Sequence, residues 1–274
     1  MRKLFIILCT FLFSSLQSQE LYVFSEPASN MPANTFSPKF KANLSNRPDS
    51  SFQRYTPEIM FGISKEFMFH MATSFSNMHS SDLKWESVFA YAKYRFYSKD
   101  EVHQHFRMAA FAEGGYSDNP LYYDEISVRG DNSGFELGWI GTQLINKTAV
   151  SLTTSFVKVY GNKPEHAHHE LVRSAINYSL SAGQLILPVE YTSYDQLNFN
   201  LYLEILGQHA LDKNASFLDF APAMQFIFNS NSKLNLGYRF QVNGNALRGV
   251  ENSFLISFEH TFFNALKKRK SKKA

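Results

Sequence analysis

The sequence predicts an all-β fold: a transmembrane antiparallel up-and-down β-barrel of about twelve strands. In residues 233–242, large apolar side chains alternate with Asn, Gly, Arg and Gln, and residues 253–263 repeat this period of two. Such alternation is typical of a strand with one apolar and one polar face. Aromatic residues make up 16% of the chain while its mean hydropathy is −0.26. This combination is expected when lipid-facing and lumen-facing residues average out along each strand.

A secretory signal peptide is predicted for residues 1–19. Arg2 and Lys3 precede an apolar run over residues 4–13, and small polar residues follow up to Ser18. This order is typical of a leader that is cleaved during export. A short membrane anchor is the weaker alternative, because about ten apolar residues make only half of a helical span. Together with the barrel pattern, the leader predicts localisation to the cell outer membrane.

The only cysteine, Cys9, lies inside this leader, so we expect no disulfide and no thiol chemistry in the exported chain. Acylation of Cys9, as in a lipoprotein, is an alternative, but the preceding residues 6–8 are large and apolar, whereas processing favours small ones. The following residues 20–35 contain two prolines and show no periodicity. They predict a lead-in segment that is tucked against or into the mouth of the barrel.

Residues 36–263 contain twelve candidate strands whose connections alternate in length. Short polar turns at residues 64–66, 146–148 and 229–232 alternate with long loops at residues 45–55, 117–133, 161–170 and 243–252. Outer-membrane barrels have short periplasmic turns and long outer loops, and the short turns all fall on the periplasmic side if the N-terminus is periplasmic. Two periplasmic connections, residues 97–105 and 187–196, are rather long for this scheme. The predicted strands are residues 36–44, 55–64, 67–78, 84–97, 106–117, 134–146, 148–160, 170–187, 196–207, 216–228, 232–242 and 253–263.

The polar faces of these strands predict which side chains line the lumen. In residues 232–242, the opposite register would place Arg239 in lipid, at a cost of about 2–4 kcal/mol near the middle of the membrane. Pro222 lacks a backbone donor and predicts a bulge or disturbed pairing in residues 216–228. The predicted lumen-lining residues are Arg173, Asn177, Glu204, Asp219, Arg239 and Glu259.

The remaining composition excludes other classes of protein. Past the leader, no apolar run reaches the roughly 18–20 residues of a helical span. The net charge is only +3, so nothing in the charge balance points to nucleic acid. Residues 264–274 form a basic tail, which predicts either a solvated periplasmic extension or contact with anionic lipid or an acidic partner.

Three stretches carry a family resemblance: the leader end SLQSQE, the terminal strand NSFLISFEHTFF and the hairpin NSNSKLNLGYRF. With them, residues 20–263 resemble the outer-membrane β-barrel proteins of Gram-negative bacteria, in particular the porin-like barrels common in Bacteroidetes. The resemblance implies insertion into outer-membrane lipid by the barrel-assembly machinery. Such proteins often end on an aromatic residue, whereas eleven residues follow Phe263 here. The assembly signal would therefore be read internally.

Two groups of residues are considered for functions other than a pore: metal binding and lipid hydrolysis. His166, His168 and His169 lie close together in a predicted outer loop, and imidazoles at such spacing can bind Zn²⁺, Cu²⁺ or Ni²⁺. The alternative is a solvated loop that is rich in histidine. For a lipid hydrolase, the nearest approach to a catalytic pair is His70 with Ser74 or Ser76 on one face of a strand, without an orienting acid.

The sequence therefore predicts a passive channel or uptake pore for a small solute or ion, without a cofactor and without enzymatic activity. The alternative is a non-conducting structural or metal-binding accessory barrel that uses the histidine-rich loop. A barrel lipid hydrolase is the third hypothesis.

Overall fold

The computed structural model of the chain describes residues 22–47, 50–102, 104–161, 170–190, 193 and 195–267. Within these residues the chain forms twelve β-strands. No helix in this part of the chain is long and apolar enough to cross a membrane. The strands are β1 Thr35–Arg47, β2 Ser50–Gly62, β3 Phe67–Ser76, β4 Lys84–Glu101, β5 Gln104–Ser117, β6 Ser133–Ile145, β7 Thr148–Tyr160, β8 Ser174–Leu187, β9 Asn198–Ala210, β10 Ser216–Phe228, β11 Ser232–Gly244 and β12 Asn252–His260.

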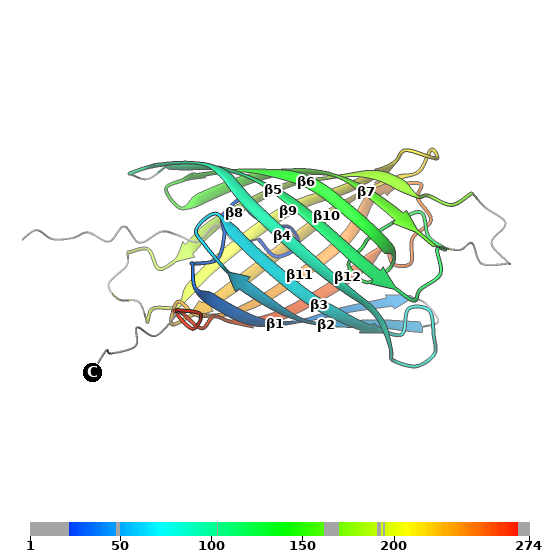
Figure 1. Cartoon of the computed structure of the whole chain (residues 1–274), viewed down its shortest axis with the longest axis horizontal. Helices are drawn as coiled ribbons and strands as arrows, with labels where there is room; N and C mark the ends of the chain where they lie inside the picture. Colours follow the sequence, from blue (N-terminus) through cyan, green and yellow to red (C-terminus); the bar gives the residue numbers. More distant parts are fainter. Residues whose placement is uncertain are drawn as a thin grey trace, which may run out of the picture.

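The sheet closes on itself. Each strand pairs with its neighbours in the sequence, and β1 pairs with β12 in an antiparallel register that runs from Lys39 opposite Glu259 to Leu44 opposite Phe254. Figure 1 shows the strands running obliquely around the long axis of the barrel. Closure leaves no sheet edge with unpaired backbone groups, which is what a β-structure in lipid requires. The predicted antiparallel up-and-down barrel is confirmed.

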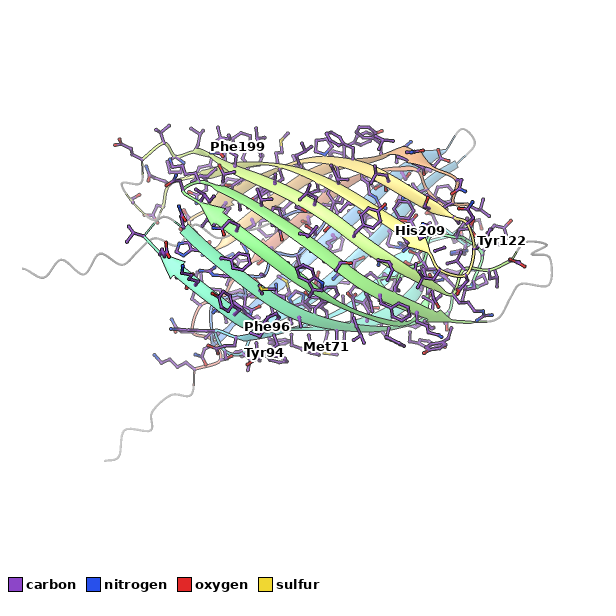
Figure 2. All side chains as sticks on the ribbon, turned by 90° about the horizontal axis from the view of Figure 1, so that it is seen from above. Met71, Tyr94, Phe96, Tyr122, Phe199 and His209 are labelled. Atoms are coloured by element: carbon purple, nitrogen blue, oxygen red, sulfur yellow. The ribbon has the colours of Figure 1, made fainter. Side chains whose placement is uncertain are left out.

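The two faces of the sheet differ in polarity. Large apolar side chains cover the outside, where Leu203 is 42% and Phe258 is 51% exposed. Met71, Tyr94 and Phe96 also lie on this outer surface (Figure 2). The alternate positions point inward and are mostly polar, as expected for strands with a period of two.

The connections separate the barrel into two ends. At the turn end, β2–β3, β6–β7 and β10–β11 are joined by short turns, in which Asn146 and Asn229 adopt positive φ angles of 54° and 49°. Asparagine tolerates this left-handed conformation better than most residues. At the loop end, the longest connections join β5 to β6 and β7 to β8. At the turn end, residues 188–197 between β8 and β9 form a longer connection than the short turns beside it, as predicted for this part of the chain.

Two predicted connections were wrong. The long loop expected at residues 45–55 is a tight connection, because β1 continues to Arg47 and β2 begins at Ser50. The connection at residues 97–105 is also short, because β4 continues to Glu101 and β5 begins at Gln104. These strand ends are polar on both sides, so they lack the alternation that marks a strand in lipid, although their backbone pairing continues.

Pro222 interrupts one of its two ladders. It lies opposite Leu203 of β9, but the register with β11 runs to Phe220 and resumes only at Ala223. A shift between Leu218 and Asp219 lies nearby. Because proline has no N–H to donate, the disturbed pairing predicted for this strand is present on the β11 side.

Introduction of a charged residue on the outer face of the barrel tests whether this face contacts lipid. We expect Leu203→Arg to destabilise the barrel in lipid by about 2–4 kcal/mol, because Leu203 lies near the middle of β9 and faces outward. Leu211→Arg is the matched control, since Leu211 lies in the loop-end connection after β9 and is 53% exposed. Urea unfolding from liposomes measures both changes, and equal destabilisation by the two substitutions would contradict this orientation.

Candidate functional site: the barrel lumen

Residues 22–34, here called the N-terminal segment, lie inside the barrel. The backbone N–H groups of Val23, Phe24 and Ser25 donate to the carboxylate of Glu204 on β9 at 2.9, 2.8 and 2.8 Å. Ser181 on β8 donates to the same carboxylate at 3.1 Å, and its Oγ lies 2.8 Å from that of Ser25. Three successive N–H groups around one carboxylate form an anion-binding concavity. The fully buried Glu204 therefore fixes the start of the N-terminal segment.

The opposite wall of the barrel holds the next part of the segment. Lys93 on β4 is fully buried and donates to the carbonyl oxygens of Pro27 at 2.7 Å and Ser29 at 2.9 Å. Between these two residues, the N–H group of Ala28 donates to Thr142 Oγ1 on β6 at 2.9 Å. The segment is thus bonded to strands on both sides of the lumen and crosses it.

Glu26 adds an electrostatic contact at this crossing. Its carboxylate lies 3.8 Å from the Lys93 ammonium. Burial alone would raise the pKa of Glu26, but the attraction of Lys93, with smaller contributions from His70, Lys39 and Arg129, lowers it to about 2. Glu26 is therefore ionised at neutral pH, and its charge favours the seated position of the segment.

Two inward-facing glycines make space for the segment. A Cβ atom on Gly237 of β11 would lie 2.6 Å from the Phe24 ring, and one on Gly62 of β2 would lie 2.1 Å from the Pro32 carbonyl oxygen. Both distances are shorter than van der Waals contact. The bare backbone at these two positions allows the chain to lie directly against the barrel wall.

The loop of residues 118–132 folds into the loop end of the lumen. Gln208 on β9 binds Ile126 twice, accepting from its N–H at 2.9 Å and donating to its carbonyl at 2.8 Å. Apolar side chains of the loop are buried against the wall, where they remove apolar surface from water. This buried cluster contains Leu121, Ile126, Val128, Val157, Val159, Val172, Ala175, Ala210 and Ala215.

Ion pairs fasten this loop to the wall and to the loop of residues 245–251. Glu125 binds Arg239 at 3.0 Å and Arg248 at 2.9 Å, and Asp219 binds the same two arginines. Arg248 also lies over the Phe217 ring, 3.9 Å from its centre. Burial would raise the pKa of Glu125, but the two guanidinium groups outweigh it and lower the pKa. Charge pairing thus joins both loops at the loop end.

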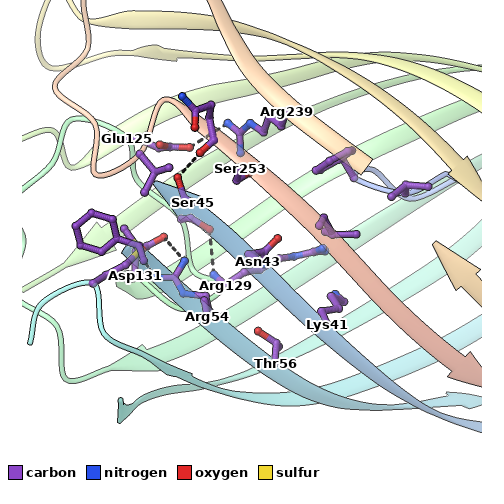
Figure 3. A pocket seen from close by; sticks show the side chains of 18 of the residues that line it. Lys41, Asn43, Ser45, Arg54, Thr56, Glu125, Arg129, Asp131, Arg239 and Ser253 are labelled. Atoms are coloured by element: carbon purple, nitrogen blue, oxygen red, sulfur yellow. Dashed lines mark hydrogen bonds and ion pairs between the residues drawn. The ribbon is translucent and has the colours of Figure 1, made fainter. Parts of the chain in front are cut away.

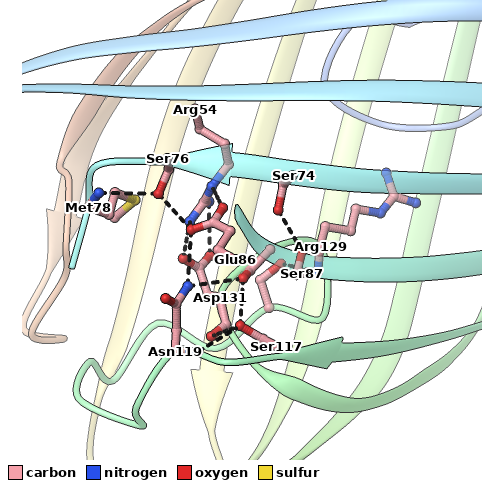
Figure 4. A network of polar contacts seen from close by, with 12 residues as sticks. Arg54, Ser74, Ser76, Met78, Glu86, Ser87, Ser117, Asn119, Arg129 and Asp131 are labelled. Atoms are coloured by element: carbon pink, nitrogen blue, oxygen red, sulfur yellow. Dashed lines mark hydrogen bonds and ion pairs between the residues drawn. The ribbon is translucent and has the colours of Figure 1, made fainter. Parts of the chain in front are cut away.

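A second polar network holds both ends of the loop of residues 118–132 (Figure 4). Arg54 on β2 binds Asp131 at 2.5 Å and Glu86 at 2.5 Å. Glu86 also accepts from Ser76 at 2.6 Å and from Asn119 at 3.0 Å. The loop is therefore tied to β4 through Asn119 and to β2 through Asp131.

The N-terminal segment separates two chambers. A cavity of about 260 Å³ lies toward the loop end, between β1, β2 and the two folded loops (Figure 3). A cavity of about 520 Å³ lies toward the turn end, among Met60, Arg107 and Lys233. Tyr22, Glu26 and Lys39 line both cavities. The lumen is thus hollow on either side of the segment and occupied where the segment crosses.

Most of the predicted lumen residues lie inside the barrel and are paired there. Glu259 binds Lys233 at 2.9 Å, and Asn177 accepts from Gln208 at 2.7 Å. Arg173 does not line the lumen: it precedes β8 and its side chain is exposed. The alternation assumed for β8 begins only at Ser174, which explains this error. His166, His168 and His169 lie outside the described residues, so metal binding there remains a prediction.

The residues considered for lipid hydrolysis are engaged in other contacts. His70 Nδ1 lies 2.9 Å from Glu58 Oε1, whereas Ser74 lies 2.5 Å from Ser87 and Ser76 donates to Glu86. These side chains are buried on the inward face of β3, away from the outer surface. In the part of the chain that the structure describes, no group of three or more His, Cys, Asp or Glu residues could hold a metal ion.

The sequence reasoning missed the cations that bind the N-terminal segment. Lys93 lies within an aromatic stretch, FAYAKYRFY, where alternation is weak because Tyr91 and Phe89 also face inward and are buried. A lysine within such an apolar stretch was the available signal, since an unpartnered ammonium there would be costly. Its partners were not visible, because they lie more than 60 positions away.

The closed sheet with an apolar exterior and a polar lumen defines the class: a transmembrane β-barrel of the outer-membrane type. No protein-family model matches the sequence, and no curated protein matches it. Among solved structures, the chain is similar to an outer-membrane channel from Pseudomonas putida F1, with 13% identity and a TM-score of 0.51, over 88% of this chain and 100% of the other.

A second similar structure is the KdgM porin in complex with disordered oligogalacturonate, with 9% identity and a TM-score of 0.50, over 83% of this chain and 99% of the other. Outer-membrane phospholipase A from Escherichia coli also matches, over 91% of this chain and 95% of the other, but at 9% identity and a TM-score of only 0.39. The similarity to the two channel structures supports the fold. No solute or activity is transferred to this chain from any of the three structures.

Proposed function

We propose that the chain is an outer-membrane channel for small hydrophilic solutes or ions, closed by its own N-terminal segment. One observation supports this most directly: the segment crosses a lumen that is hollow on both sides of it. A twelve-stranded barrel is intermediate between barrels filled by side chains and barrels with an aqueous channel. Displacing one short segment would therefore join the two chambers.

The contacts of the N-terminal segment are of a kind that can break when the segment moves out of the lumen. Most of those described above are hydrogen bonds and ion pairs, which water can replace when the segment moves away. The strand ladders of the barrel do not include residues 22–34, so their loss would leave the wall closed. Opening is a shift between two states whose populations depend on the stability of this docking.

The proposal includes the remaining features of the chain. Residues 1–19 are removed on export, residues 264–274 remain on the periplasmic side, and the barrel-assembly machinery inserts the chain into the outer membrane of a Gram-negative, Bacteroidetes-type cell. The apolar outer face, with Trp85 41% and Tyr94 53% exposed, supports insertion into lipid, because aromatic residues are enriched at membrane interfaces.

A reversible cross-link tests the proposal. The Oγ atoms of Ser25 and Ser181 are 2.8 Å apart, a spacing that suits a disulfide between cysteines at these positions. The exported chain has no other cysteine. We expect the oxidised Ser25→Cys/Ser181→Cys variant to be non-conducting in planar bilayers, and reduction to restore wild-type openings.

The two single-cysteine variants serve as controls, because oxidant should leave their conductance unchanged. Equal conductance of the oxidised and reduced double variant would show that the segment does not close the pore. A barrel that stays insulating in every form would favour the alternative, a non-conducting structural or accessory barrel. The tight apolar packing of Tyr22, Val23 and Phe24 within the lumen is the observation that favours this alternative.

A further inference from the structure

Lys39 lies where the two chambers meet. It is an inward-facing residue of β1, and it lines the cavities on both sides of the N-terminal segment. In the sheet register it stands opposite Glu58 of β2 and Glu259 of β12. A solute that passes from one chamber to the other would therefore pass its ammonium group.

The two carboxylates opposite Lys39 are bound to other lysines. Glu58 pairs with Lys41 at 2.7 Å, and Glu259 pairs with Lys233 at 2.9 Å. Among the described residues, Lys39 itself forms no hydrogen bond and no ion pair within 4 Å. Its side chain is half-buried and borders open lumen space on both sides.

The other charges near Lys39 are paired with partners of their own. Glu26 is the third carboxylate that acts on Lys39 electrostatically, but it is the partner of Lys93. Arg129, which also acts on Lys39, pairs with its own carboxylate, Glu113, at 2.8 Å. Four ammonium groups thus stand beside three carboxylates, which leaves one positive charge in excess. A charge in a narrow lumen with low-dielectric walls acts strongly on passing ions.

We propose that Lys39 forms an anion-binding site that makes the channel selective for small anionic solutes such as carboxylates and phosphates. The proposal rests on the channel function proposed above and names its class of solute. When the N-terminal segment moves away, Glu26 moves with it, and the excess at the boundary rises from one positive charge to two. Opening therefore strengthens the preference for anions.

Ion selectivity provides the first test. The reversal potential of the refolded full chain is measured in a KCl gradient for the wild type, Lys39→Gln and Lys158→Gln. We expect an anion-selective wild type, a several-fold lower chloride-to-potassium permeability ratio in Lys39→Gln, and a wild-type ratio in Lys158→Gln, since Lys158 is exposed outside the lumen. Glu58→Gln should shift the ratio the opposite way, because it leaves Lys41 without its partner.

Anion binding provides a second readout that does not need conduction. Calorimetric titration at low salt, with inorganic phosphate and with acetate, should show binding to the wild type and to Lys158→Gln, and none to Lys39→Gln. Heat-modifiable migration on gels verifies that each variant is folded. Conducting barrels with equal selectivity and equal phosphate binding would overturn the role of Lys39. An insulating barrel in all variants would instead overturn the channel function, and loss of phosphate binding in Lys39→Gln would then support the anion site alone.

Discussion

Deletion of residues 22–32 converts the barrel into a steadily conducting pore, with a time-averaged conductance about tenfold or more above that of the wild type. The deletion removes the part of the N-terminal segment that crosses the lumen and joins the chambers of about 260 and 520 Å³. It leaves every strand intact, because β1 begins at Thr35. Planar-bilayer recording of the refolded variant measures the effect.

A matched control removes residues 268–274 of the basic tail, which should leave the conductance at the wild-type level. A folded deletion variant that remains as closed as the wild type would place the barrier elsewhere. The loops of residues 118–132 and 245–251 would then be responsible, because Glu125, Asp219, Arg239 and Arg248 fasten them across the loop end.

Glu204→Ala should raise the open probability by about 5- to 150-fold, which corresponds to a loss of about 1–3 kcal/mol of docking free energy. The substitution leaves the N–H groups of Val23, Phe24 and Ser25 without their acceptor. Buried donors that stay unsatisfied destabilise the docked position, so the segment gains more by moving into water. Single-channel recording measures the open probability.

Glu136→Ala is the matched control for this prediction. Glu136 is another lumen carboxylate, but it accepts from Ser155 and Asn177 of the wall, so its loss changes the lumen charge equally without touching the N-terminal segment. Glu204→Gln should give an intermediate open probability, because its amide oxygen can still accept. Equal open probabilities for Glu204→Ala and the wild type would contradict the role of Glu204 in docking.

The sequence predicted the wall of the barrel well. Leu201 and Leu203 of β9 face outward while Asn200 and Glu204 face inward and are buried, as the period of two required. This pattern is local, because neighbouring residues on a strand must point to opposite sides of the sheet. The strand end that contains Asp100 and Glu101 was not predicted, because both faces of a strand contact water where it extends beyond the lipid.

The contents of the lumen could not be predicted in the same way. Residues 20–35 were expected against or in the barrel mouth on composition alone. Nothing in their sequence pattern indicates that they bind Glu204, Lys93 or Thr142. The N–H of Val23 reaches a carboxylate 181 positions away, and such a contact exists only after the barrel has closed. Arg173 shows the same limit, because the face of the sheet to which its side chain points depends on where β8 begins.

The charge pairing of the lumen was likewise decided by the tertiary structure. The sequence indicates that Lys39, Lys41 and Lys233 are cations, but only the registers of β1 with β2 and β12, and of β11 with β12, bring them beside Glu58 and Glu259. Alternation along each strand determined which side chains face the lumen. Closure of the sheet decided which of them meet, because it joins the first and last strands and encloses the N-terminal segment in the lumen.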